Sequence, residues 1–174
     1  MSGAQVQTWA TGRLGTSVPP GQCFDLLDQA LRQTGHKSAA DFGPVTTWAN
    51  YIWGSVGSLG SLAPGDLIQF LNYRIDVHVA WDDGATWDGS ETRPHHSAIV
   101  DSVGAGGEIV ILEQNAPPGS TVHRSRIFLS DGTVATKASQ TMSSISQIPP
   151  ATAPSANVRV NVRGTLWYYR AVTR

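Results

Sequence analysis

The chain has 174 residues and a net charge of −1, with 40% hydrophobic and 14% charged residues. This length is typical of one domain with a sizeable core, and the low charge content argues against a disordered chain. A net charge near zero gives no electrostatic reason to expect nucleic acid as a partner. We expect no membrane span either, because no apolar run approaches the ~20 residues that a span requires.

The first segment, residues 1–20, is polar and ends in "SVPPG". We expect it to form an N-terminal arm, followed by a single catalytic domain over residues 21–174. The segment lacks the apolar core of a signal peptide. The sequence therefore predicts synthesis in the cytoplasm without such a signal.

A helix is predicted over residues 22–34. Phe24, Leu27 and Leu31 recur at helical spacing, and Gly35 is suited to the C-terminal cap. The next segment, residues 41–65, is interrupted by Gly and Pro but rich in Trp and Tyr. We expect a short second helix in part of it and loop in the remainder.

Strands are predicted in the second half of the chain, where short runs of β-branched and aromatic residues dominate. The runs are "GDLIQFLNYRIDVHVAW", "HSAIVDSV", "GEIVILEQN", "TVHRSRIFLS" and "GTLWYYRAV". "GAGG" between the second and third runs indicates a hairpin, and the polar stretch 139–157 indicates a surface loop. Helices followed by strands predict an α+β fold, with N-terminal helices packed on a central antiparallel β-sheet.

Cys23 is the only cysteine, so it cannot form a disulfide within the chain. Its place in the first turn of the predicted helix favours a thiolate, because unpaired backbone N–H groups and the helix dipole stabilise negative charge there. Two interpretations stay open at this point. Cys23 is a nucleophile, or it is a small buried apolar side chain chosen for its fit.

A thiol nucleophile needs a base, and the base needs an orienting partner. His96 opens the predicted strand "HSAIV", from which it can reach over the sheet edge towards a helix N-terminus. Glu113 and Asn115 lie two apart in a predicted strand, so both emerge on one face and can orient an imidazole. Each of these residues taken alone is equally suited to an ordinary structural role.

Taken together, six segments resemble the CHAP family of cysteine, histidine-dependent amidohydrolases/peptidases, within the NlpC-type, papain-like group. They are "GQCFDLLDQAL" at 21–31, "YIWG" at 51–54, "PGDLIQF" at 64–70, "HSAIV" at 96–100, "LEQN" at 112–115 and "GTLWYYR" at 164–170. The resemblance implies a papain-like fold with Cys23 as nucleophile and His96 as general base. It also implies that Glu113 orients the histidine with Asn115 as the accompanying polar residue, and that Gln22 stabilises the oxyanion. Asp66 matches a structural turn.

Five further side chains are candidates for the walls of a substrate cleft: Trp48, Tyr51, Trp53, Trp87 and His95. Trp87 belongs to an insertion at residues 72–94 that is longer than the resemblance predicts. This insertion is either a lid beside the catalytic histidine or a decorated hairpin loop. The doubled histidine at 95–96 leaves two imidazoles to choose from, and His96 aligns with the family strand.

The resemblance implies a cysteine amidase or peptidase acting on bacterial peptidoglycan or a peptide, with no cofactor and no metal. Such an enzyme would act in the periplasm or outside the cell after non-classical delivery, as an antibacterial effector or a lysin. An injected effector would have an immunity protein as a partner. Two alternatives remain: a papain-like effector acting on a protein or lipid, and a non-catalytic binding domain of the same fold.

Overall fold

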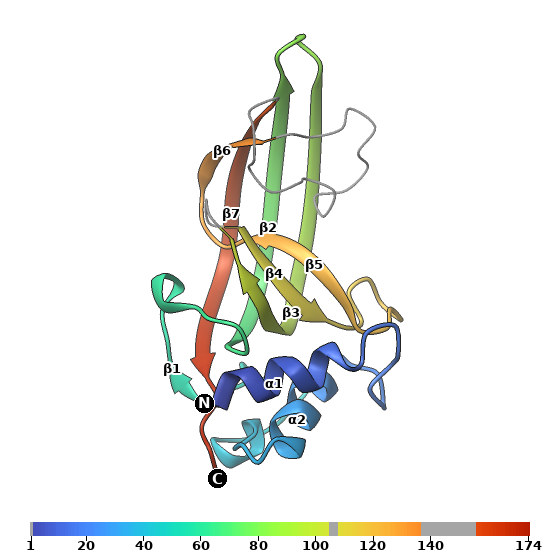
Figure 1. The fold of residues 1–174 in the computed structure, drawn as a ribbon, viewed down its shortest axis with the longest axis vertical. Helices are drawn as coiled ribbons and strands as arrows, with labels where there is room; N and C mark the ends of the chain where they lie inside the picture. The colour runs from blue at the N-terminus through green and yellow to red at the C-terminus, as the bar shows by residue number, and fades with distance from the viewer. Residues whose placement is uncertain (1, 105–107, 137–155) are drawn as a thin grey trace.

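A computed structural model describes residues 2–104, 108–136 and 156–174 (Figure 1). Two α-helices come first, α1 (Ser2–Thr11) and α2 (Cys23–Gln33), with the 3₁₀ turns η1 (Ala39–Asp41) and η2 (Leu59–Ser61) after them. The strands are β1 (Ser55–Val56), β2 (Leu67–Trp81), β3 (Thr86–Val103), β4 (Glu108–Glu113), β5 (His123–Phe128), β6 (Gly132–Thr136) and β7 (Ala156–Arg170). Helices and an antiparallel sheet in one fold are consistent with the expected α+β class, with the sheet contributing most residues.

The sheet has 7 strands in the order β1-β7-β2-β3-β4-β5, and β6 pairs with β7. All of these pairs are antiparallel. β2 lies at the centre and pairs along nearly its whole length with β3 on one side and β7 on the other. The last described strand of the chain is therefore part of the middle of the sheet.

Alternate side chains of β2 enter two separate apolar clusters, as strand geometry requires. Leu67 joins the cluster that includes Leu27 and Leu31 of α2. Ile68 and Phe70 join the other cluster, which β2 shares with β3, β4 and β7. In Figure 1, α1 and α2 lie together at one end of the sheet, near both chain termini.

The N-terminal segment differs from the expected polar arm. Residues 2–11 form α1, and its Val6 and Ala10 are fully buried in the same cluster as Leu27. α1 packs against α2 and β3. Only a narrow apolar stripe of α1 is buried, so the segment has the composition of a polar arm although it packs against the core.

The short second helix expected within residues 41–65 is wrong. This stretch holds the end of η1, then β1 and η2, and no α-helix. Gly and Pro recur too closely there for an α-helix, because each of them lowers helix propensity strongly. The stretch wraps instead past α2 towards the start of β2.

The insertion at residues 72–94 is a hairpin, as the second alternative held, but it is regular strand and not loop, because it continues β2 and β3 (Figure 1). Pairing runs without a break in the sheet from Tyr73 opposite Arg93 to Ala80 opposite Thr86. His96 consequently lies inside β3, whereas the sequence analysis expected it to open a strand.

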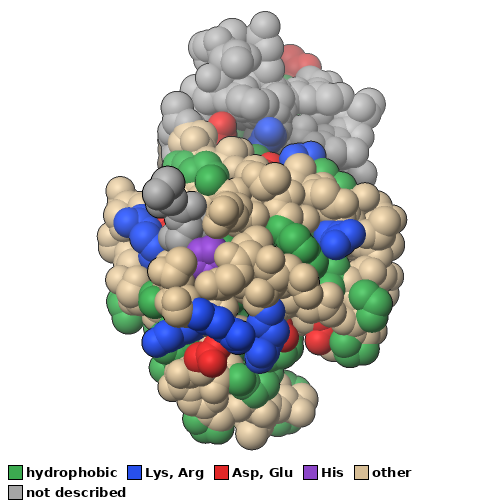
Figure 2. Space-filling view, turned by 60° about the horizontal axis from the view of Figure 1, so that its bottom comes forward, with side chains coloured by type: hydrophobic (Ala, Val, Ile, Leu, Met, Phe, Trp, Pro, Cys, Tyr) green, Lys and Arg blue, Asp and Glu red, His purple; other side chains and the backbone are tan. Residues whose placement is uncertain are grey.

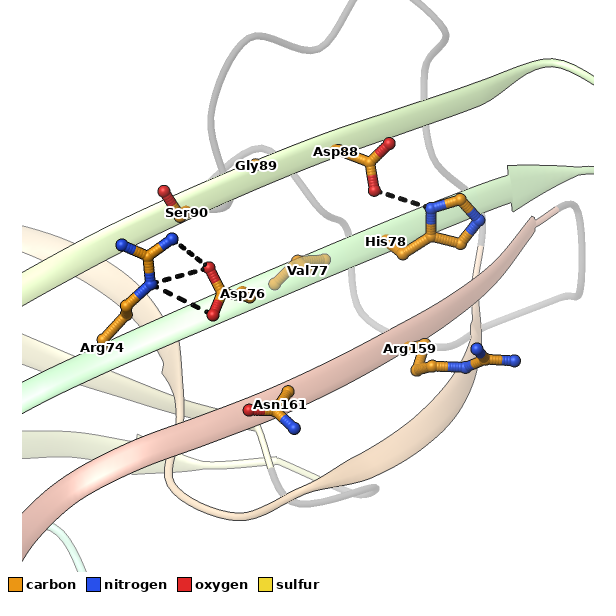
Figure 3. Close-up of a pocket in the computed structure, with 9 residues that line it drawn as sticks. All are labelled: Arg74, Asp76, Val77, His78, Asp88, Gly89, Ser90, Arg159 and Asn161. Carbon is orange, nitrogen blue, oxygen red and sulfur yellow. Dashed lines mark hydrogen bonds and ion pairs between the residues drawn. The ribbon is translucent and has the colours of Figure 1, made fainter.

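The hairpin extension has one apolar and one polar face. Its polar face carries a shallow pocket of about 450 Å³, drawn in Figure 3. Charged groups there neutralise one another, since Arg74 pairs with Asp76 at 2.6 Å and the His78 ring lies 2.7 Å from Asp88. None of the residues that line this pocket lines the pocket that contains Cys23.

The remaining strand predictions are largely confirmed. β3 and β4 form the expected hairpin, and β5 falls within "TVHRSRIFLS". β7 begins earlier than "GTLWYYRAV" suggested, and β6 was not foreseen. Most of the predicted loop 139–157 lies outside the described residues, although its last two positions begin β7.

None of the helices within the described residues combines the length and the apolar character needed to cross a bilayer. In the view of Figure 2, which brings the lower end of Figure 1 forward, basic and acidic side chains lie next to one another. This mixed surface agrees with the low net charge of the whole chain.

Candidate active site

Helix α2 begins at Cys23, so the thiol lies at the end of the helix that carries unpaired N–H groups. Gln22 before it has an extended backbone, with φ −84° and ψ 160°. The carboxylate of Asp25 accepts hydrogen bonds from the N–H groups of Gly21 (3.1 Å) and Gln22 (2.7 Å). This local cap fixes where the helix starts and therefore where the thiol points.

Gln114 of the β4 end holds the same segment from the other side. Its side chain is fully buried and accepts from the Val18 N–H at 2.9 Å. Its amide donates to the carbonyl oxygens of Val18 (2.9 Å) and Gln22 (2.7 Å). Sequence analysis assigned Gln114 no role, yet it ties the segment before Cys23 to the sheet.

His96 and Glu113 come from neighbouring strands, β3 and β4, and meet in the interior. The His96 Nε2 atom lies 2.8 Å from Glu113 Oε2, and both side chains are buried. The Cys23 thiol and the His96 ring line the same pocket, and the two groups lie close enough for each to shift the pKa of the other. Since Nε2 faces the carboxylate, Nδ1 is the ring nitrogen left for the thiol.

Arg93 is a further member of this cluster that sequence analysis missed. Its Nε donates to Glu113 Oε2 (2.9 Å) and its Nη2 to Glu113 Oε1 (2.7 Å). Strict strand alternation places residues three apart on opposite faces, so no pattern pointed from His96 to Arg93.

A backbone irregularity brings them to one face. Asn72 of β2 has a positive φ of 51°, and the pairing of β2 with β7 shifts between Leu71 and Arg74. As a result Phe70 and Tyr73, three residues apart, enter the same apolar cluster. Their partners across β3 are His96 and Arg93, which follow the same change of phase.

The protonation states follow from these contacts. Burial raises the pKa of the Cys23 thiol, but the hydrogen bond and charge of His96, with the N–H groups of Ser97 and Phe24, lower it overall. Burial lowers the pKa of His96, yet Cys23 and Glu113 together raise it to about 9. His96 and Arg93 hold the pKa of Glu113 far below its usual range despite burial. The site thus favours a thiolate beside an imidazolium.

Two pockets flank the imidazole and give access to it. One, of about 490 Å³, is lined by Cys23 and Tyr51, and the other is about 900 Å³. Both are lined by Trp48, His95, His96 and Asn115. A chain lying across the site can therefore extend to either side of the thiol.

Three of the five predicted wall residues lie at this cleft. Trp48 is 82% exposed, and the Tyr51 hydroxyl donates to the Thr46 carbonyl. The His95 ring lies 2.8 Å from the Ala49 carbonyl oxygen and contacts the Tyr51 ring. Because His95 bonds the loop, His96 is the imidazole that faces Cys23 and Glu113.

The other two lie elsewhere. Trp53 is fully buried and donates to Gln69 Oε1 at 3.0 Å, so it cannot touch a substrate. Trp87 belongs to the hairpin extension, nine residues before His96, which is about 30 Å along a strand. Its ring packs against the apolar cluster of the sheet.

Asn115 is at the site, but in a different place from that expected. Its amide donates to Gln22 Oε1 at 2.9 Å, and its own oxygen accepts from the Gly119 N–H at 2.7 Å. It therefore orients Gln22 and not the imidazole. With its oxygen occupied, the Gln22 amide has its N–H₂ free to face the pocket that contains Cys23.

Asp66 has the structural contacts expected of it. It accepts from the Ala63 N–H at 2.9 Å and pairs with Arg170 of β7 at 3.2 Å. Over residues 2–104, 108–136 and 156–174, no cluster of three or more His, Cys, Asp or Glu residues is arranged to hold a metal ion.

Comparison with known proteins bears on the fold. The model of the AIM3/BBC1 cysteine proteinase-fold domain matches residues 1–134. No curated protein and no solved structure gives a significant match. The family model supports the papain-like fold and includes α1, the helix that was expected to be an arm. The match does not support the narrower assignment to the CHAP or NlpC families.

Proposed function

Because the chain belongs to the family of AIM3/BBC1 cysteine proteinase-fold domains, and because its only thiol contacts a buried imidazole, we propose that it is a cysteine-dependent amidohydrolase or peptidase. The observation that carries the proposal is the series Cys23–His96–Glu113, in which the thiol lies beside the imidazole at a helix N-terminus and the imidazole is hydrogen-bonded to the carboxylate, with pockets flanking the imidazole. Nucleophile, base and orienting carboxylate stand in the order that thiol catalysis needs.

The reaction follows from these positions. The Cys23 thiolate attacks the amide carbonyl carbon, and the oxyanion receives hydrogen bonds from the Gln22 side chain and a backbone N–H. The imidazolium of His96 gives its proton to the leaving amine as the carbon–nitrogen bond breaks. Water, losing a proton to His96, then hydrolyses the thioester and restores the thiol. Glu113 holds the ring in one orientation throughout.

The cleft favours a substrate that extends on both sides of the bond. Its larger pocket is lined partly by Trp48 and by Pro94, Pro117 and Pro118, which offer apolar surface. Such a lining suits a peptide segment with apolar side chains. An amide within a chain is therefore a better candidate than one at a free terminus.

The finer assignment remains the one implied by the resemblance: a CHAP- or NlpC-type enzyme that cleaves amide bonds of bacterial peptidoglycan, as an antibacterial effector or a lysin with an immunity protein. A protein or lipid substrate is the alternative. Incubating the enzyme with purified peptidoglycan and with a denatured protein panel separates the two, with Cys23→Ala as the inactive control. The substrate is the material, peptidoglycan or protein, from which wild type releases fragments and Cys23→Ala does not.

The catalytic proposal itself is tested on the thiol, without knowledge of the substrate. Cys23 is the only cysteine, so alkylation by iodoacetamide, followed by intact mass, reports on this site alone. We expect rapid alkylation below pH 7 that slows at least tenfold in His96→Ala, since an ordinary thiol is almost fully protonated there. A wild-type rate that rises only near pH 8.5 would overturn the proposal and favour a non-catalytic binding domain.

A further inference from the structure

Arg93 holds both oxygens of the carboxylate that lies behind the imidazole. Its Nε and Nη2 donate to Glu113 at 2.9 and 2.7 Å, while its Nη1 donates to the Thr92 carbonyl at 3.1 Å. Its side chain is only 10% exposed, and that of Glu113 is 0% exposed. A bidentate pair of this kind fixes the plane of the carboxylate as well as its position.

The charges of the buried cluster balance only when Arg93 is counted. A thiolate at Cys23, an imidazolium at His96 and a carboxylate at Glu113 sum to one negative charge. The guanidinium of Arg93 brings this sum to zero. A net charge in a buried site is costly, and without Arg93 the cluster would become neutral by binding a proton.

We propose that Arg93 is a positioning residue of the active site, whose guanidinium fixes Glu113 and supplies the positive charge that keeps Cys23 a thiolate. This inference rests on the proposed function, which needs that thiolate. Arg93 lines the larger pocket, but its hydrogen bonds go to Glu113 and to the Thr92 carbonyl and not to the thiol. It acts through Glu113.

Other charged or titratable groups lie around this cluster at greater distance. Glu91 of β3 is 3.7 Å from Arg93 Nη2, and His123 of β5 is 3.7 Å from Glu113 Oε1. Asp25 of α2 is bound to backbone N–H groups, and His95 bonds the Ala49 carbonyl. The Tyr51 phenol, whose pKa is raised by burial first and then by Cys23, stays neutral. At 2.7–2.9 Å, Arg93 is much closer to Glu113 than His123 is, and it shares the carboxylate with His96 at 2.8 Å.

The experiment measures the rate of Cys23 alkylation by iodoacetamide from pH 5 to pH 10 in wild type, Arg93→Met, Arg93→Lys and Arg74→Met. Arg74 is the matched control, because it also binds a carboxylate with two nitrogens but lies opposite Thr92, on the other face of the sheet from Arg93. We expect Arg93→Met to lower the alkylation rate at pH 6 about tenfold or more. At pH 9.5, where any thiol ionises, the rate should return to that of wild type. Arg93→Lys should restore part of the rate, and Arg74→Met should match wild type.

A second variant separates charge from simple loss of structure. Arg93→Met combined with Glu113→Gln removes one charge of each sign, so the cluster can again hold a thiolate and an imidazolium. The alkylation rate of this double variant at pH 6 should exceed that of Arg93→Met alone. If Arg93→Met does not fold, the rate of the double variant is compared with that of wild type. If the folded Arg93 variants alkylate with the wild-type pH midpoint, the proposal for Arg93 is wrong while the proposed function stands. A wild-type thiol that titrates normally would overturn the proposed function itself.

Discussion

At the scale of single residues, the Cys23–His96 pair links the protonation of the site to the stability of the fold. The imidazole has its pKa raised from 6.5 to about 9, so its contribution to stability is lost as pH rises across that range. The thiol has its pKa lowered from 9.0, so its contribution is lost as pH falls. The two contributions oppose each other between pH 6.5 and 9.

Replacing the thiol should expose the imidazole's contribution alone. In Cys23→Ala, Glu113 still raises the pKa of His96, so stability should fall by about 1–2 kcal/mol from pH 6.5 to pH 9. Wild type should lose less over the same interval, because the contribution of the thiol rises with pH. Urea unfolding midpoints at several pH values measure both. Equal slopes for the two proteins would contradict an ion pair at this site.

Gln114 offers a second test at this scale. Gln114→Ala removes three hydrogen bonds from a fully buried position and leaves the Val18 and Gln22 backbone groups without them. We expect a loss of about 3 kcal/mol in the free energy of unfolding, since each unsatisfied buried group costs ~1–3 kcal/mol. Chemical denaturation measures it. The exposed change Gln5→Ala on α1 is the control, because Ser120, which is nearer, also bonds this turn.

At the scale of elements, the irregularity at Asn72 is the feature on which the site depends. Gly164 of β7 faces it with a φ of 102°, and a Cβ there would lie 2.4 Å from the Asn72 carbonyl oxygen. Only glycine fits this place, because both the backbone conformation and the close approach exclude a side chain.

Gly164→Ala should therefore destabilise the protein by roughly 2–4 kcal/mol, from backbone strain together with the contact to Asn72. It should also slow Cys23 alkylation at pH 6, because Arg93 depends on the same change of phase. Gly132→Ala in β6 is the matched control, with open space around its Cβ position. Thermal unfolding of both variants gives the comparison, and equal midpoints would show that the irregularity tolerates a side chain.

This irregularity also marks where sequence reasoning ended. Helix α2, the start of β2 and the β3–β4 hairpin follow from period and turn residues, and so do the positions of Cys23, His96 and Glu113. The β2 half of the hairpin extension was within a predicted strand, whereas the β3 half was missed because Asp88, Ser90 and Thr92 made a strand with one polar face resemble a loop. Arg93 was missed because the positive φ at Asn72 reverses the alternation of side chains between the two faces of the strand. An asparagine in a strand sequence does not by itself predict such a change.

At the scale of the whole molecule, the family model and the fold have different limits. The model matches residues 1–134, whereas β7 spans Ala156–Arg170 and pairs with β1, β2 and β6. The residues beyond the match therefore complete the middle of the sheet. No sequence pattern indicated that a late strand would lie beside the first long one, since such pairing is decided by the fold as a whole.

A chain truncated after residue 134 should consequently fail to fold. Loss of β7 exposes one side of β2 and opens the apolar cluster that contains Val158 and Val160. We expect no cooperative thermal transition and strong binding of a hydrophobic dye such as ANS, with the full chain as the control. A sharp transition near that of the full chain would mean that residues 1–134 are a sufficient folding unit.

The central place of β7 has a kinetic consequence. Its pairs with β2 join positions 75 to 102 residues apart, from Trp81 with Ala156 to Leu67 with Tyr169. Pairing over such separations must overcome a large loop-closure entropy, so folds with high contact order form slowly. During synthesis the long β2–β3 hairpin leaves the ribosome before β7. The edge of β2 that pairs with β7 therefore stays unpaired until β7 has emerged. The nascent chain is then most exposed to aggregation and to chaperones while its reactive thiol has already been made.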